Sequence, residues 1–124
     1  MVIYNQMVVD QILENEQADR VFHALADSTR RDILLRTLEG EHNVSALARG
    51  YPMSFAAVQK HVAVLEGAGL VMKERKGREQ LVRGNVETTR QAYRLLEKLE
   101  AVWQARMDRI GDLLADEQKE GPQA

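Results

Sequence analysis

Residues 52–71, PMSFAAVQKHVAVLEGAGLV, combine polar and small side chains with the spacing of one helix face. That face consists of Ser54, Phe55, Ala56, Gln59 and Lys60. A glutamine amide can bond adenine in the major groove of DNA, a lysine can contact phosphate or guanine, and Phe or Ala can touch a thymine methyl group. The segment therefore has the chemistry of a helix that reads double-stranded DNA.

The opposite face of this helix is apolar and would anchor it in a core. Its residues follow i, i+3, i+4, i+7 spacing: Val58, His61, Val62 and Leu65. Ser54 is placed to cap its start, and Gly67 and Gly69 to end it. A shorter helix precedes it, capped by Asn43 and stopped by Pro52. Two short helices joined by a tight turn predict a helix-turn-helix.

An earlier helix should supply part of that core. Asp27 is placed to cap it and Gly40 to end it. The predicted apolar set of this helix is Ile33, Leu34, Leu35 and Leu38.

After the helix-turn-helix, the sequence alternates as a β-hairpin does. The segment LVMKERKGREQLVRGN predicts two strands with Gly77 in the turn. Five cations fall here against two acidic residues, and we assign Lys73, Arg75, Lys76 and Arg78 to a wing that contacts DNA phosphates. A charged hairpin can also be a solvated sheet edge. The order of the elements, with the basic hairpin directly after the small-faced helix, favours the wing.

The charge of the chain is unevenly distributed. The 124 residues carry a net charge of -2, which by itself does not indicate a nucleic-acid partner. However, the first nineteen residues contain four carboxylates and no Lys or Arg, whereas the hairpin is basic. The sequence thus predicts one basic working face on an otherwise acidic protein.

Helices at both ends carry more apolar surface than one small domain can bury. We predict one domain, residues 1–116, that is mainly α with a small β-hairpin. It divides into an N-terminal dimerisation helix (1–17), a DNA-binding winged helix-turn-helix core (18–85) and a C-terminal dimerisation helix (86–116), followed by a polar tail (117–124). The predicted homodimer interface comprises Tyr4, Met7, Val8, Leu96, Leu99, Trp103 and Ile110.

Several classes of chemistry find no support in the sequence. The chain has no cysteine, which removes disulfides, thiolate metal sites and thiol nucleophiles. Its serines are better explained as caps than as nucleophiles. We therefore predict no catalytic residue, no metal site and no cofactor. No signal peptide or membrane-spanning segment is predicted, so we expect a cytoplasmic protein.

From Phe22 to Arg83 the sequence resembles the winged helix-turn-helix core of the ArsR/SmtB repressors. The resemblance is carried by LADSTRRDIL, VSALA, MSFAAVQKHVAVLEGAGLV and KGRE. It implies a homodimer that binds a palindromic operator and represses transcription.

The sequence also departs from the metal-sensing members of that family. Those members carry a Cys-containing motif in the helix written here as VSALARGY, or His and carboxylate ligands on the terminal helix. This chain has no Cys, and its three histidines lie outside the terminal helix, so it resembles the branch without a metal site. Two alternatives remain: a regulator with a small-molecule pocket between terminal helices, lined by Trp103 and Tyr93, and a protein-interaction module on the same fold.

Overall fold

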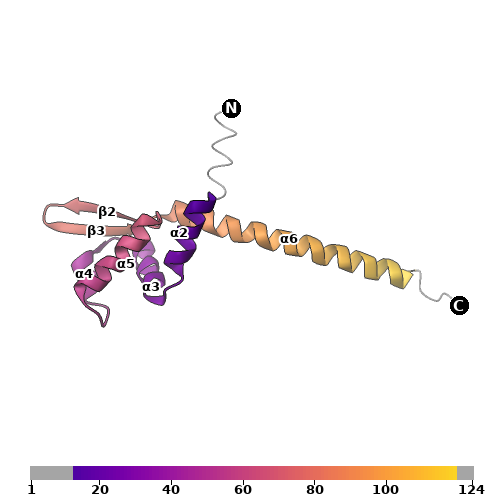
Figure 1. Cartoon of the computed structure of the whole chain (residues 1–124), viewed down its shortest axis with the longest axis horizontal. Helices are drawn as coiled ribbons and strands as arrows, with labels where there is room; N and C mark the ends of the chain where they lie inside the picture. The colour runs from indigo at the N-terminus through magenta and orange to yellow at the C-terminus, as the bar shows by residue number, and fades with distance from the viewer. Residues whose placement is uncertain (1–12, 120–124) are drawn as a thin grey trace, which may run out of the picture.

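The computed structural model of the chain describes residues 13–119. Its elements, in chain order, are α2 (Asn15–Leu25), α3 (Ser28–Glu39), β1 (His42–Asn43), α4 (Val44–Ala48), α5 (Phe55–Gly67), β2 (Val71–Lys76), β3 (Glu79–Gly84) and α6 (Val86–Lys119). The first seven elements pack together, with the β2–β3 hairpin projecting at one end and α6 leaving as an arm at the other (Figure 1). This arrangement confirms a winged helix-turn-helix with a long C-terminal helix.

Side-chain caps begin three helices where the sequence predicts them. The Asp27 carboxylate accepts the backbone N–H of Arg30 at 3.1 Å and starts α3. Asn43 accepts from Ser45 at 2.8 Å at the start of α4, and Ser54 accepts from Ala57 at 3.1 Å at the start of α5. Each cap satisfies an amide that has no partner within its helix, which fixes the start of that helix.

The core closes around the inner face of α5, but one predicted part of it is wrong. Val58, Val62 and Leu65 are fully buried, as predicted. In α3, however, the buried positions are Ile33, Leu34 and Thr37, while Leu35 is 57% exposed and Leu38 is 38% exposed. Consecutive residues of a helix lie about 100° apart, so one face cannot bury three successive apolar side chains.

The sheet has three strands rather than the two of the predicted hairpin. β2 and β3 form the hairpin in antiparallel register, with Gly77 in the turn at φ +63°. The additional strand β1 pairs with β3 through His42 and Asn43, giving the order β1-β3-β2. Two residues are too few to show the alternation that reveals a strand in sequence. The strand joins the base of the wing to the start of α4.

A single residue, Asn85, joins the wing to α6. Its backbone N–H donates to the Leu70 carbonyl at 2.7 Å, and its side-chain amide donates to the Gly69 carbonyl at 3.0 Å. Its side-chain oxygen accepts the N–H of Glu87 at 3.1 Å, which caps α6. Gly69 itself has φ +79°, a conformation that favours glycine. The end of α5, both strands and the start of α6 therefore meet at one hydrogen-bonded junction.

The C-terminal helix is longer than predicted, and most of the predicted N-terminal helix lies outside the described residues. α6 starts at Val86, as predicted, and continues to Lys119, past the predicted boundary at residue 116. α2 starts at Asn15, within the segment assigned to the N-terminal dimerisation helix. Tyr4, Met7 and Val8 belong to residues outside the described range.

We expect Gly84→Ala to destabilise the protein, because β3 passes very close to α3 at this position. A β-carbon at Gly84 would lie 2.7 Å from Leu38 Cγ and 3.0 Å from the Leu38 backbone nitrogen. Relieving such a contact costs on the order of 1–3 kcal/mol of unfolding free energy. Gly67→Ala, where no atom lies within 4 Å, is the matched control and should not lose stability. Urea denaturation at fixed protein concentration measures both, and equal stabilities would contradict the prediction.

Candidate nucleic-acid interface

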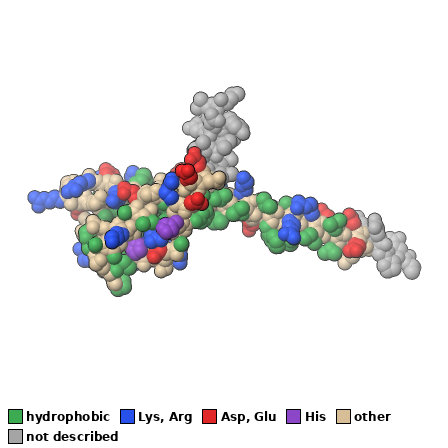
Figure 2. Space-filling model, viewed as in Figure 1, with side chains coloured by type: hydrophobic (Ala, Val, Ile, Leu, Met, Phe, Trp, Pro, Cys, Tyr) green, Lys and Arg blue, Asp and Glu red, His purple; other side chains and the backbone are tan. Residues whose placement is uncertain are grey.

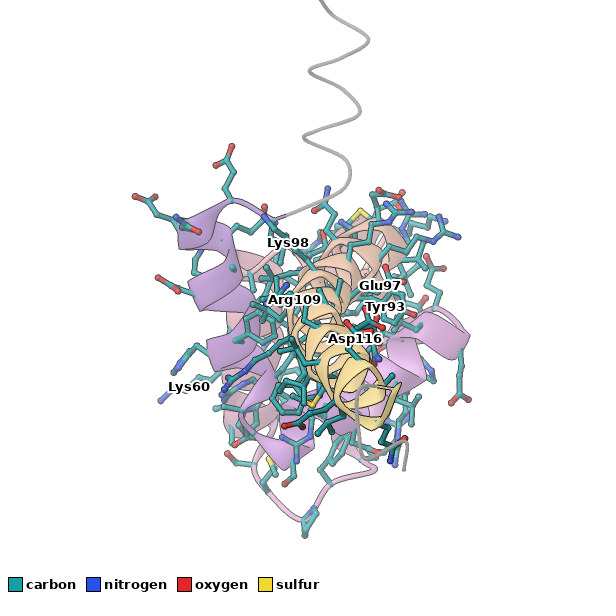
Figure 3. The ribbon with its side chains drawn as sticks, turned by 90° about the vertical axis from the view of Figure 1, so that its right-hand side faces the viewer. Lys60, Tyr93, Glu97, Lys98, Arg109 and Asp116 are labelled. Carbon is teal, nitrogen blue, oxygen red and sulfur yellow. The ribbon has the colours of Figure 1, made fainter. Side chains whose placement is uncertain are left out.

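The outer face of α5 is open to solvent. All five side chains that the sequence places there are exposed: Ser54, Phe55, Ala56, Gln59 and Lys60. Lys60 points away from the core in the view along α6 (Figure 3). Because the opposite face of α5 is buried, this face can contact a large ligand without rearrangement of the core.

A groove of about 380 Å³ separates α5 from the wing. Its floor is apolar and comes from Val44, Val62 and Ala63. Its polar lining comes from Gln59 and Lys60 of α5 and from Lys73 and Gln80 of the hairpin. The structure thus places two of the predicted base-reading residues beside one predicted wing residue. Sequence reasoning missed Val44 and Gln80, because only the folded hairpin places them at this groove.

The cations of the wing fall into two groups. Lys73 is half-buried at the base of the hairpin, where its Nζ lies 3.3 Å from a carboxylate oxygen of Glu66 on α5. Arg75, Lys76 and Arg78 are exposed towards the tip and form no ion pair within residues 13–119. Figure 2 shows basic side chains gathered at that tip. Lys73 links the wing to α5, and the other three cations are available to an anionic partner.

Arg30 of α3 fastens α5 to the preceding helices. Its guanidinium donates to the carbonyl oxygens of Ala24 at 2.8 Å and His23 at 3.1 Å, and contacts His61 Nδ1 at 3.3 Å. The predicted core histidine is therefore half-buried and paired with a cation, so its Nδ1 must be the acceptor. The backbone N–H of Arg30 also holds the pKa of the Asp27 carboxyl below its usual range. One side chain thereby joins α2, α3 and α5.

A second polar cluster holds the turn before α5. The Tyr51 hydroxyl donates to Asp32 Oδ2 at 2.6 Å, and Arg36 Nε lies 3.0 Å from the same oxygen. The Arg36 guanidinium also lies over the Tyr51 ring, 4.9 Å from its centroid. Burial and the hydrogen bond to Asp32 together raise the pKa of Tyr51 well above its ordinary value. The cluster fixes the turn relative to α3 and hence the start of α5.

The arm α6 displays an apolar surface on its own. The four predicted interface residues on it are all exposed: Leu96, Leu99, Trp103 and Ile110. Hydrophobic side chains continue along the arm beyond the core (Figure 2). Exposed apolar surface of this extent marks a site of interaction in a folded protein.

Residues 13–119 contain neither a cluster of metal ligands nor a membrane-spanning helix. No three His, Asp or Glu side chains in this part of the chain come together as a potential metal site. None of the helices described in it is long and apolar enough to span a bilayer.

Comparison with known proteins returns transcriptional regulators. No protein-family model matches the chain. It is 49% identical over 53 residues to the HTH-type transcriptional regulator Rv2034 of Mycobacterium tuberculosis, a match that covers 43% of this chain and half the length of that protein. It is 37% identical over 81 residues to the uncharacterized HTH-type transcriptional regulator YuzN of Bacillus subtilis, covering 59% of this chain and 87% of that one.

Solved structures show the same architecture. An ArsR-like transcriptional regulator from Rhodococcus sp. RHA1 superposes with a TM-score of 0.71 at 33% identity, over 79% of this chain and 92% of that one. The homodimeric winged helix-turn-helix DNA-binding domain of Mb0332 from Mycobacterium bovis gives a TM-score of 0.56 at 27% identity, over 82% and 81% of the two chains.

We expect Tyr51→Phe to lower the unfolding free energy at neutral pH by about 1–2 kcal/mol, because it removes a hydrogen bond to a carboxylate. The raised pKa of Tyr51 gives this contribution a pH dependence. Above about pH 10 the unfolded chain ionises this phenol while the folded protein still keeps it protonated. The contribution of the hydroxyl to the unfolding free energy is therefore complete below about pH 10 and declines as the pH rises further.

Urea denaturation of both proteins at pH 7 and pH 11 measures this effect. The difference in stability between wild type and Tyr51→Phe should shrink at the higher pH. A difference that stays constant or grows would show that the hydroxyl does not hold its proton in the folded state.

Proposed function

Because the chain belongs to the ArsR family of winged helix-turn-helix transcriptional regulators, we propose that it is a sequence-specific, double-stranded DNA-binding repressor. In this proposal it acts as a homodimer on a palindromic operator and does not respond to metal ions. The regulators it resembles support the class of activity, and the surface around α5 supports the mode of binding.

The observation that carries the proposal is the pairing of an exposed helix face with a basic hairpin across one groove. Gln59 and Lys60 line the groove from α5, and the free cations of the wing lie beyond it. A helix in the major groove reads base edges, whereas contacts to phosphates position the protein without reading sequence. We therefore assign base reading to α5 and backbone contact to the wing.

One ion pair narrows the set of residues that we propose to contact phosphate. Lys73 is engaged by Glu66 at 3.3 Å, so we assign it to holding the wing against α5. Arg75, Lys76 and Arg78, together with Lys60, leave four cations in each protomer for the DNA backbone.

Dimerisation through α6 would place two such surfaces about a two-fold axis. The Mycobacterium bovis relative is described as a homodimeric DNA-binding domain, which supports this assembly. Two recognition helices of a dimer contact half-sites about one helical turn apart, roughly 34 Å, and the symmetry of the protein requires a palindromic site.

Independence from metal ions rests on the sequence. The chain has no cysteine to supply a thiolate. Two of its three histidines are engaged, His61 by the Arg30 guanidinium and His42 by the Arg36 carbonyl at 3.1 Å.

Binding should depend steeply on salt concentration. Selection of genomic fragments bound by the purified protein supplies the operator and tests its symmetry. If four cations per protomer each neutralise one phosphate, a plot of log affinity against log salt should have a slope near -7, by the rule of about -0.9 per phosphate. Fluorescence anisotropy between 50 and 300 mM salt measures the slope, and a flat response would exclude this mode of binding.

Substitutions on α5 and on the wing should affect DNA binding in different ways. Gln59→Ala should relax preference at one base pair in each half-site, at a cost on the order of 1–3 kcal/mol. Arg78→Ala should weaken binding to all sequences alike and make the salt slope shallower. Competition between the operator and single-base variants measures both, with Glu97→Ala on the distant arm as the control. Identical behaviour of the two variants would contradict the division of roles.

A further inference from the structure

The groove between α5 and the wing has a recessed apolar floor that contact with DNA does not explain. Val44 and Val62 line the groove although they are only 4% and 1% exposed, so the groove reaches down to side chains of the core. A duplex meets a protein mostly through phosphates and sugars. Such a partner suits the cations beside the groove, but it has no apolar part that would fill the recess between α5 and the hairpin.

The lining of this groove has the make-up of a pocket for a small ligand. Such pockets measure about 300–1,000 Å³ and combine an apolar lining with a few polar groups that fix the orientation of the ligand. Here the polar groups are Gln59 and Lys60 on the side of α5 and Lys73 and Gln80 on the side of the hairpin. The volume of about 380 Å³ is near the lower end of that range, which suits a compound of one or two rings.

The hairpin turns two of its cations towards this groove. Lys73 stands directly opposite Val82 in the β2–β3 register, and Arg75 stands opposite Gln80. Residues opposite each other in an antiparallel pair point to the same side of the sheet, and alternate positions of a strand share that side. Because Val82 is fully buried, Lys73, Arg75 and Gln80 lie on the side of the hairpin that faces the core and α5.

Both carboxylates of the hairpin point the other way. Glu74 follows Lys73 in β2, and Glu79 precedes Gln80 in β3, so each occupies an intervening position on its strand. Their side chains therefore lie on the far side of the sheet. The side that faces α5 carries only cationic, neutral polar and apolar side chains, which makes it a suitable wall for an anion.

The charges at the groove leave room for one negative charge. Its described lining contains two ammonium groups, those of Lys60 and Lys73, and no carboxylate. Lys73 is balanced by Glu66, whose carboxylate oxygen lies 3.3 Å from its Nζ. Lys60 is exposed and forms no ion pair within residues 13–119. A ligand with a single negative charge would therefore complete the pairing of these groups.

We propose that the groove binds a small aromatic monocarboxylate. Its ring lies on the apolar floor, its carboxylate pairs with Lys60, and the side-chain amides of Gln59 and Gln80 supply further hydrogen-bond donors. A rigid ring suits this site better than an alkyl chain. The groove is open to solvent along one side, and a flexible chain would lose more conformational entropy on binding than so open a groove returns.

This ligand would regulate DNA binding by direct exclusion, a consequence that rests on the proposed function. A bound carboxylate covers Gln59 and Lys60, the residues that we assign to base and phosphate contact. A ligand that binds only the DNA-free protein weakens operator binding by the factor 1 + [L]/Kd for each protomer. At ten times its Kd, the acid should therefore lower operator affinity about tenfold for each protomer that it occupies.

NMR titration of the full chain without DNA tests the site, with cinnamate as the probe and uncharged cinnamamide as its matched control. Signals of the Gln59 and Gln80 side-chain amides report where the probe binds. We expect a Kd of roughly 1 mM for so small a ligand on an open groove. Cinnamamide should bind at least about tenfold more weakly, because it lacks hydrogen bonds to a charged group. Equal affinity for both compounds, or no binding of cinnamate up to about 10 mM, would overturn the proposal.

Glu66→Gln should tighten cinnamate binding. The substitution releases Lys73 from a partly exposed ion pair, and we expect a gain of about two- to fivefold in affinity. Cinnamamide binding should not change. A gain of affinity cannot result from misfolding, and Glu97→Gln on the arm, which removes the same charge far from the groove, should have no effect. An unchanged or weaker affinity in Glu66→Gln would contradict the assignment of the carboxylate to these lysines.

Ala63→Leu should abolish cinnamate binding, because the larger side chain occupies the groove. Ala63 is exposed, so the change leaves the core intact, and Ala101→Leu at an exposed position of the arm is the matched control. Cinnamate binding that survives Ala63→Leu would place the acid elsewhere on the protein and overturn the proposal.

Fluorescence anisotropy with the operator, at constant ionic strength, then separates this inference from the proposed function. Loss of operator affinity with cinnamate but not with cinnamamide supports exclusion. Binding of cinnamate in the groove with unchanged operator affinity would overturn it. If the groove binds cinnamate and the protein binds no DNA fragment, the proposed function fails while the ligand site stands.

Discussion

The surface of this protein depends on the burial of one side of a thirteen-residue helix. Val58, Val62 and Leu65 of α5 are withdrawn completely from solvent, and each such side chain contributes about 2 kcal/mol. The opposite face of the same short helix must stay exposed. Each turn of α5 therefore carries apolar side chains on one face and small or polar side chains on the other. The small residues Ala56 and Ala63 leave the exposed face of α5 free for close approach.

Apolar burial alone would not set the direction in which the bare side points, because hydrophobic packing has little directional preference. Polar contacts supply that direction. Arg30 ties the middle of α5 to the carbonyl oxygens that end α2, and Tyr51 ties the preceding turn to Asp32. Lys73 and Glu66 then set the wing against the far end of the helix. The orientation of α5 thus rests on contacts at its start, middle and end.

The sequence predicts most of this fold because local rules determine it. The caps at Asp27, Asn43 and Ser54 and the turn at Gly77 follow from residue type, and the two sides of α5 follow from spacing. The missed features depend on tertiary contacts. β1 exists only because β3 offers it a partner, and the elements that pack against α3 decide which of its sides is buried, the one with Thr37 rather than the one with Leu35. The groove, likewise, needs the angle between α5 and the hairpin, which no local pattern records.

The junction at Asn85 has a mechanical consequence. No loop separates the wing from the arm: β3 ends at Gly84, α6 begins at Val86, and the residue between them is held by both its backbone and its side chain. These hydrogen bonds couple the orientation of α6 to that of the hairpin. Any twist applied far out on the arm must therefore turn the hairpin as well, or break the bonds that Asn85 makes to Gly69 and Leu70.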